Sequence, residues 1–210
     1  MTRLSQVPKA GAPSEVLRIY QEFFGERDPV ISPGTSTGTP GNYWTTFALV
    51  PDLMEMAYNT LIPLLQPGRQ LDPQLRELVI LRTAIVGDSK FEYSQHCKVA
   101  RAVELPEEKI AAIKAWTTSN CFSQTERVAM AATDQILTLN RVEDETFGLL
   151  KQCLTDRAIL ELFVVAGLWR MHGFISRALH LEYDNDTTDR LTEIPATTMD
   201  AEFQCRPRPP

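Results

Sequence analysis

The residues of this chain with the clearest chemical potential lie in the segment FEYSQHCKVA, residues 91–100. Glu92 and His96 are four positions apart, so in a helix they share one face, and Tyr93 and Cys97 lie beside them. A neighbouring carboxylate fixes the tautomer of an imidazole and suits it to general acid/base chemistry near neutral pH. The alternative is a local helix ion pair, which would contribute only about 0.2–0.5 kcal/mol.

A second carboxylate, Glu77, lies in the nearly continuous apolar segment QLRELVILRTAIV. A carboxylate at such a position is paired, or neutral with a raised pKa, or exposed on a narrow polar strip with Arg76 and Thr83. A purely structural ion pair is the alternative. The presence of Glu77 upstream favours a site over an isolated helix ion pair at Glu92 and His96.

The spacings of known metal and nucleophile motifs are missing. His-Glu-x-x-His is absent, and the Glu–His spacing of four differs from the Glu-x-x-His of di-iron bundles. The cysteines, at positions 97, 121, 153 and 205, form no Cys-x-x-Cys pair, and Cys97 is interpreted as a small buried side chain. The GxSxG elbow of serine hydrolases is also absent. Because the metal-binding spacings are missing, we predict no bound metal.

Composition limits the partners and the compartment. A length of 210 residues suits one domain, or one domain with extended ends, and a net charge of −6 without a cationic cluster argues against a nucleic-acid partner. The N-terminus lacks the apolar run of a secretion signal, and the longest apolar run, residues 162–168, is far shorter than a membrane span. We expect a cytoplasmic protein with reduced thiols and no membrane partner.

The elements that must position these residues are all expected to be helices, because period-two alternation and hairpin turns are missing. Asp72 with Pro73, and Ser123 with Glu126, are typical helix starts. Helices are expected over residues 14–25, 73–86, 90–105, 106–116, 123–139, 144–153 and 155–181, with a segment over 43–66 interrupted by Pro51 and Pro63.

Three regions follow from this pattern. Residues 1–43 hold an N-terminal helix and a Pro/Gly-rich loop, residues 44–184 form the helical domain, and residues 185–210 form a polar tail. The loop around residues 32–41 does not match a phosphate-binding loop. A loop of this length is a plain connector or a lid over a site.

The segment LDPQLRELVILRTAIVGDSKFEYSQHCKVARAVELPEEKIAAI resembles the carboxymuconolactone decarboxylase family, relatives of the alkylhydroperoxidase D-like proteins. The resembling features are L-x-P-x-x-R-E-L-V-I-L-R, a short break, a [FY]-E-[WY]-x-x-H-x-x-x-A helix and a Leu-Pro-Glu-Glu helix start. The later LELFVVAGLWRMHGFISRALHLEYD resembles the family's last helix. The resemblance covers roughly residues 44–184 and implies an all-α, alkylhydroperoxidase D-like helical bundle that is cofactor-free and forms homo-oligomers, trimers or hexamers.

The peroxidase branch of these proteins uses a Glu, a Cys-x-x-Cys pair and a His. Glu77 and His96 match the Glu and the His, whereas Ser89 and Glu92 stand where the two cysteines would be. Without a thiol pair, peroxide reduction through a disulfide cycle has no chemistry to run on. The decarboxylase-like branch remains.

In that branch the resemblance implies loss of CO2 from a γ-carboxylated unsaturated lactone. The resulting dienolate must be stabilised and then reprotonated. We expect His96 to supply the proton, Glu92 or Glu77 to set its charge and orientation, and Arg82 and Tyr93 to bind the small-molecule substrate. The length beyond the compact family core favours a larger, polyketide-like acid of secondary metabolism. Alternatives are an isomerase, cyclase or dehydratase on the same residues, or a non-catalytic small-molecule-binding helical oligomer.

Overall fold

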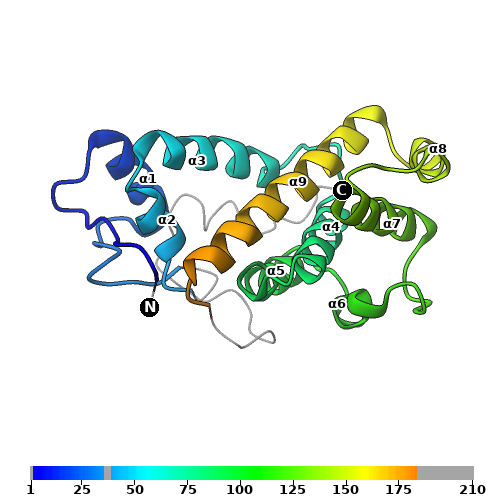
Figure 1. Ribbon diagram of the computed structural model, residues 1–210, viewed down its shortest axis with the longest axis horizontal. Helices are drawn as coiled ribbons and strands as arrows, with labels where there is room; N and C mark the ends of the chain where they lie inside the picture. Colours follow the sequence, from blue (N-terminus) through cyan, green and yellow to red (C-terminus); the bar gives the residue numbers. More distant parts are fainter. Residues whose placement is uncertain (1, 36–38, 184–210) are drawn as a thin grey trace, which may run out of the picture.

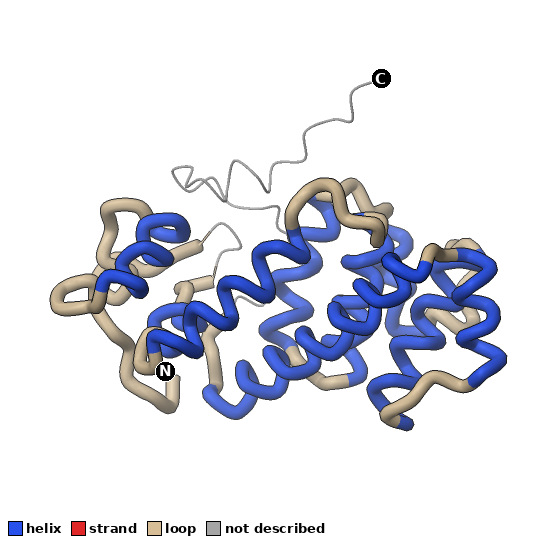
Figure 2. The backbone as a smooth tube through the Cα atoms, turned by 90° about the horizontal axis from the view of Figure 1, so that it is seen from above, coloured by secondary structure: helices blue, strands red, loops and turns tan. Residues whose placement is uncertain are grey.

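The computed structural model describes residues 2–35 and 39–183, and this part of the chain consists of helices and connecting loops (Figure 2). The prediction of an all-α fold is confirmed. The predicted polar tail at 185–210 lies outside the described residues.

The helices, shown in Figure 1, lie close to their predicted positions, except that the helix beginning at Pro51 continues through Pro63, where an interruption was expected. Asp72 caps one of them by accepting hydrogen bonds from the backbone N–H groups of Gln74 and Leu75, and Ser123 and Glu126 form the expected capping box. The elements are α1 Ser14–Phe24, α2 Asn42–Phe47, α3 Pro51–Leu65, α4 Pro73–Val86, α5 Lys90–Ala102, α6 Glu107–Ala112, the 3-10 helix η1 Ile113–Ala115, α7 Gln124–Leu139, α8 Asp144–Cys153 and α9 Asp156–Leu179.

Helix α4 is the centre of the main core. It packs against α5, α7 and α9, and nine of its 14 residues are buried. A helix that contacts neighbours on every side buries its whole circumference, which explains why its sequence is apolar all round. Two of the three charged residues inside this helix, Arg76 and Glu77, are buried with it.

A second apolar cluster holds the N-terminal region in place. Val16, Ile19 and Phe24 of α1 pack with Met54 of α3, beside the main core. The ends of the predicted 32–41 loop are tied together, because the backbone N–H of Gly34 donates to the carbonyl of Pro40. The two roles predicted for this loop, a lid or a plain connector, both stay predictions.

Helix α9 runs diagonally across the front of the molecule (Figure 1). By length and composition alone it is apolar enough to cross a membrane, and within the described residues it is the single helix that meets this criterion. A core helix of a soluble protein meets the same criterion, and α9 packs against α4, α5 and α7. This property is therefore weak support for a membrane span.

The close approach of α9 to α5 depends on a glycine. A Cβ atom at Gly173 would lie 3.1 Å from Cβ of Ser89 and 3.6 Å from Cγ of Glu92. Gly167, six residues earlier on the same helix, is exposed, and a Cβ there would meet no atom within 4 Å.

We expect Gly173→Ala to lower the free energy of unfolding by about 1–3 kcal/mol, because the added methyl group overpacks the contact with Ser89. Gly167→Ala is the matched control and should raise it by up to about 1 kcal/mol, since Ala is the better helix former and the site is open. Urea unfolding of both variants measures the difference. Equal effects at the two positions would contradict a tight α5–α9 contact.

Candidate functional site

Glu77 and His96, 19 residues apart in the sequence, meet inside the core. Oε2 of Glu77 lies 2.7 Å from Nδ1 of His96, and Oε1 accepts a hydrogen bond from Nε of Arg76 at 2.9 Å. Burial by itself would raise the pKa of Glu77, but the Arg76 guanidinium and His96 hold it below its ordinary value. Of the three states predicted for this carboxylate, the structure supports the paired, ionised one.

Trp169 of α9 completes the surroundings of His96. Its indole N–H donates to Nε2 of His96 across 2.6 Å, with the two rings nearly perpendicular. An indole nitrogen can only donate, so Nε2 must be the acceptor and Nδ1 must carry the proton that points to Glu77. The hydrogen-bond partners thus define one neutral tautomer of His96.

Glu92 lies near Nε2 of His96, whereas Glu77 contacts the other ring nitrogen, Nδ1. Its Oε2 is 3.9 Å from Nε2 of His96, too far for a hydrogen bond, and its Oε1 accepts from the hydroxyl of Ser176 at 3.2 Å. Burial raises the pKa of Glu92, and the opposing effects of His96 and Ser176 do not reverse the shift. The predicted Glu92–His96 pair is therefore weaker than the Glu77–His96 pair.

The two carboxyl groups differ in their favoured protonation states. Glu77 faces a guanidinium and an imidazole N–H, whereas Glu92 faces a serine hydroxyl and the nitrogen that accepts from Trp169. Pairs of titratable groups with pKa values pushed apart are a common arrangement for acid/base chemistry. This arrangement suits proton transfer at the Glu92 side and charge support at the Glu77 side.

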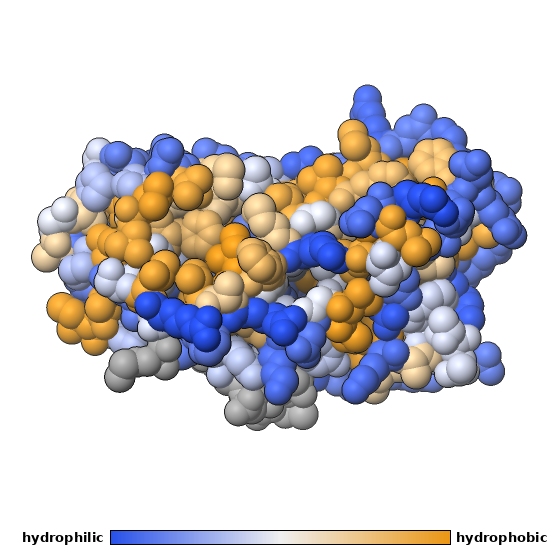
Figure 3. All heavy atoms as spheres, viewed as in Figure 1, coloured by the Kyte–Doolittle hydropathy of each residue, from blue (hydrophilic) through white to orange (hydrophobic). Residues whose placement is uncertain are grey.

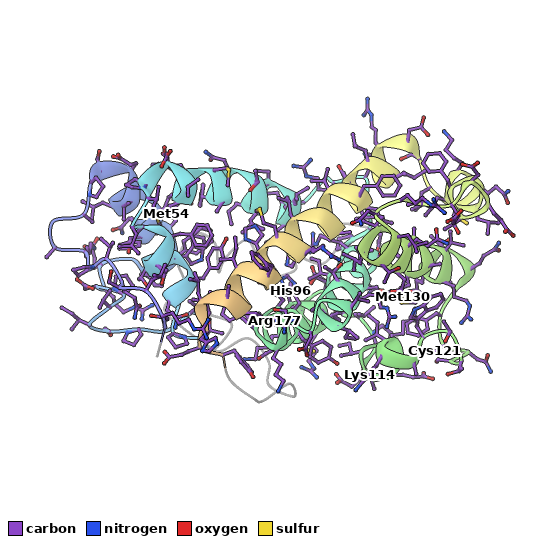
Figure 4. The ribbon with its side chains drawn as sticks, in the orientation of Figure 1. Met54, His96, Lys114, Cys121, Met130 and Arg177 are labelled. Carbon is purple, nitrogen blue, oxygen red and sulfur yellow. The ribbon has the colours of Figure 1, made fainter. Side chains whose placement is uncertain are left out.

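An open cleft of about 1250 Å³ lies beside this cluster. Its lining includes Trp169, Ser89 and Ser176, which contact His96 or Glu92. Figure 4 shows His96 where α9 crosses over α5, with Arg177 farther along α9. Cationic side chains on the cleft wall are Lys90, Arg170 and Arg177.

Arg82 is not near His96. Its guanidinium makes a bidentate ion pair with Asp134 of α7, with N–O distances of 2.5 and 2.9 Å, and donates to the carbonyl of Ile113. It does not belong to the cleft lining. Arg82 therefore ties α4 to α7 and η1, and the substrate-binding role predicted for it is not supported.

Tyr93 also faces away from the cleft. Its hydroxyl interacts with the thiol of Cys97, near Arg101 and Glu107, and burial raises its pKa to about 12. Cys97 is fully buried, and burial raises the pKa of its thiol to about 11. Cys97 is thus the small buried side chain that was expected, while a substrate-binding role for Tyr93 finds no support.

Helix α9 contributes residues to the site that were not predicted from the sequence. Trp169 and Ser176 contact His96 and Glu92, and His172 between them lies 2.5 Å from the hydroxyl of Tyr43. Burial lowers the pKa of His172 to about 4, so this second histidine is neutral at physiological pH. The signal was present, because positions 169, 172, 173 and 176 mark one face of an otherwise apolar helix.

Metal-ligating side chains do not gather elsewhere in the described part of the chain. There, His, Cys, Asp and Glu form no group of three or more that could hold a metal ion. The absence of a metal from the working protein stays a prediction.

The helical fold resembles that of alkylhydroperoxidase D-like structures, and the buried cluster of Glu77, Glu92 and His96 holds no thiol pair. The model of the Carboxymuconolactone decarboxylase family matches residues 51–135, which confirms over this part of the chain the family predicted from the sequence. The matched segment contains Glu77, Glu92 and His96, whereas Trp169 lies outside it. A comparison with curated protein sequences gives no significant match.

Solved structures share the fold at low sequence identity. An uncharacterized peroxidase-related protein with an alkylhydroperoxidase AhpD core, from Ralstonia eutropha JMP134, has a TM-score of 0.69 at 12% identity and covers 89% of this chain and 94% of its own. A putative antioxidant defence protein AhpD from Agrobacterium tumefaciens has a TM-score of 0.62 at 19% identity, covering 67% and 96%. The debrominase Bmp8, solved with 2,3,4-tribromopyrrole, has a TM-score of 0.67 at 14% identity, covering 88% and 93%.

We expect Glu92→Gln to stabilise the protein increasingly as pH rises. The pKa of Glu92 is higher in the folded state than in the unfolded chain, so above the unfolded pKa this carboxyl ionises more readily in the unfolded state. The free energy of unfolding of the wild type then falls, by up to about 1.4 kcal/mol for each unit of upward shift. The gain over wild type should vanish below pH 4.5, the ordinary Glu value, and grow above it. Urea unfolding across pH 4–8 measures it.

Glu77→Gln is the matched control for this experiment, and its effect should have the opposite sign. The pKa of Glu77 is lowered in the folded state, so its ionised form stabilises the protein above pH 4.5 and this contribution is lost as pH falls. Glu77→Gln should therefore be less stable than wild type at pH 7, with a smaller gap in acid. The same sign for both variants would contradict the assignment of the two carboxyls.

Proposed function

We propose that the protein is a cofactor-free acid/base enzyme, a decarboxylase-like lyase acting on a carboxylated lactone or a related small cyclic acid in the cytoplasm. The observation that carries the proposal is the buried cluster in which an ionised Glu77 and a carboxyl with a raised pKa, Glu92, flank the neutral His96. An ion pair alone would not require a second carboxyl that favours its neutral form.

The reaction would begin with loss of CO2 from the substrate carboxylate. The electron pair of the breaking C–C bond moves into the conjugated carbonyl and gives a dienolate. A proton then adds to carbon, and the Glu92 carboxyl is the group whose raised pKa keeps a proton available for it. Solvent returns that proton to Glu92. His96, oriented by Glu77, would relay the proton through the lone pair of its Nε2.

The cleft supports an acidic substrate. Lys90, Arg170 and Arg177 lie on its wall, together with the acidic Asp88 and Glu182. Arg177 already pairs with Asp88 at 3.3 Å, so Lys90 and Arg170 are better placed than Arg82 to hold a carboxylate. Arg170 and Arg177 are themselves positioned by hydrogen bonds to the carbonyls of Leu137 and Gly87. Apolar lining residues such as Phe91 and Phe174 suit the remainder of a cyclic or polyketide-like molecule.

The comparisons support a small-molecule enzyme rather than one particular reaction. The family is named for a decarboxylase, while similar folds belong to peroxidase-related proteins and to a debrominase solved with a bromopyrrole. Ser89 and Glu92 occupy the positions of the peroxidase thiol pair, and Cys97 is buried with a raised pKa. These features favour proton transfer over thiol chemistry.

The same residues also suit other proton-transfer reactions. An isomerase, cyclase or dehydratase needs a base and an acid near one substrate, which His96 and Glu92 provide without loss of CO2. A non-catalytic small-molecule-binding protein would need the cleft but not the opposed carboxyls. Release of CO2 from a carboxylated butenolide, compared with isomerisation of its decarboxylated analogue, separates these possibilities.

We expect His96→Ala to reduce the rate of CO2 release from γ-carboxylated butenolides by about 10²–10⁴-fold, the usual contribution of a positioned acid/base group. Helical content, measured by circular dichroism, should be unchanged, because Arg76 still pairs with the buried Glu77 when His96 is removed. Glu92→Gln should cause a comparable loss by removing the ionisable proton.

Cys97→Ala is the control for thiol chemistry, since Cys97 follows His96 directly but is fully buried and does not line the cleft. It should keep activity within a few fold of wild type. Full turnover in His96→Ala would overturn the proposed function, and loss of turnover in Cys97→Ala alone would favour a thiol mechanism.

We also propose that the chain forms a homo-oligomer, as the family resemblance implies. Large apolar side chains are exposed on the front face, where orange patches follow α9 and α3 in Figure 3. On α9 they recur at helical spacing, with Leu160 64% exposed, Val164 41% and Phe174 71%. An apolar stripe of this kind favours an interface between subunits.

If α9 forms the subunit contact, Leu160→Glu and Val164→Glu should shift the protein to a smaller species in light scattering, because a charge would be buried at the contact. Leu139→Glu, on the exposed end of α7, is the control and should leave the mass unchanged. A wild-type protein that is monomeric at all concentrations would contradict the proposal.

A further inference from the structure

Trp169 lines the cleft and at the same time donates its indole N–H to Nε2 of His96. The bond is 2.6 Å long, and both side chains are buried, with Trp169 3% and His96 7% exposed. The other ring nitrogen of His96 is held by Glu77 at 2.7 Å. Both nitrogens of the histidine are therefore occupied by protein groups.

This arrangement conflicts with a direct role of His96 while the indole stays in place. A neutral imidazole offers one lone pair, at Nε2, and an N–H donor takes up that lone pair. A substrate atom that exchanges a proton with Nε2 must occupy the same position as the indole N–H. The space for a displaced indole lies next to it, because the same side chain borders the cleft of about 1250 Å³.

We propose that Trp169 is a positioning residue that holds His96 in the Nδ1–H tautomer with Nε2 capped, and that a substrate O–H group replaces the indole N–H at Nε2. The inference rests on the proposed acid/base function of His96. It restricts the substrate to molecules that present a hydroxyl, enol or carboxylic acid O–H to the histidine, since a group that only accepts hydrogen bonds cannot replace an N–H donor.

The indole of Trp116 provides a comparison, because its hydrogen bond has a purely structural role. Its N–H donates to Oδ2 of Asp134 at 3.1 Å, and that carboxylate already receives the bidentate guanidinium of Arg82. The acceptor of Trp116 therefore keeps strong partners without the indole. The Nε2 atom of His96 has no other hydrogen-bond donor recorded in the described residues, because Glu92 is 3.9 Å away.

Nitrogen NMR of the histidine rings tests the inference directly. The chain has three histidines and three tryptophans, so ring signals of selectively labelled protein are few. In the wild type, His96 should show a protonated Nδ1 and an Nε2 with the shift of a hydrogen-bonded acceptor. In Trp169→Phe the chemical shift of Nε2 should move to the value of an unprotonated nitrogen that receives no hydrogen bond. In Trp116→Phe, the matched control, the chemical shift of Nε2 should not change.

Diethyl pyrocarbonate, which acylates a free imidazole lone pair, gives an independent readout. We expect Trp169→Phe to raise the rate of acylation at His96 by about five- to tenfold, the value of one ordinary hydrogen bond. The exposed His180 serves as an internal reference in the same molecule, and its rate should not change. Mass spectrometry of the peptides that carry the two histidines provides both rates.

A wild-type spectrum with a protonated Nε2 would overturn the inference, even if Trp169→Phe fails to fold. Unchanged spectra and unchanged acylation of His96 in a folded Trp169→Phe variant would also overturn it. Neither measurement requires turnover. Failure of the inference is thus seen in spectra and labelling, whereas failure of the proposed function is seen in CO2 release by His96→Ala.

Discussion

The rest of the site depends on the ionised carboxylate of Glu77, which is completely buried in the centre of the molecule. An isolated charge in such a position costs several kcal/mol, so it must be compensated by partners with good geometry. Arg76 supplies a guanidinium from the same helix and His96 supplies an N–H from the next one. The requirement to compensate Glu77 therefore fixes how α5 lies against α4 and which nitrogen of His96 carries its proton.

The second constraint is the close contact of α9 with the start of α5. Gly173 allows the α9 backbone to approach Ser89 and Glu92, and one turn away on either side Trp169 and Ser176 reach His96 and Glu92. One face of α9 thus supplies polar groups to the cluster while its opposite side carries exposed apolar residues. The apolar composition of α9, which resembles that of a membrane span, follows from these two roles: one face packs against the core and the other carries exposed apolar residues.

The sequence was sufficient where local rules decide the structure. Helix starts at Asp72 and Ser123 and the buried character of α4 follow from capping and periodicity. The partner of His96 was harder to predict, because Glu92 is four residues away whereas Glu77 is brought in only by packing of α4 on α5. The misplacement of Arg82 has a simple reason: five residues after Glu77 it points about 140° away around the helix, toward α7. The spacing of positions 169, 172, 173 and 176 marks one face of α9, but no local rule states which distant helix this face will cover.

Glu92 shows how the same scaffold position can support different chemistry. It lies in the first turn of α5, capped by Ser89, where the helix N-terminus favours negative charge by about 0.3–1 kcal/mol. In that position a cysteine would be activated as a thiolate, which is what the peroxidase pattern requires. A carboxyl is affected differently here, because Ser176 and Gly173 enclose it and burial of its charge costs several kcal/mol. Desolvation therefore outweighs the helix N-terminus and raises the pKa of Glu92. Where the peroxidase pattern has a thiol, this chain thus carries a carboxyl that favours its neutral form, beside a histidine whose orientation the fold already fixes.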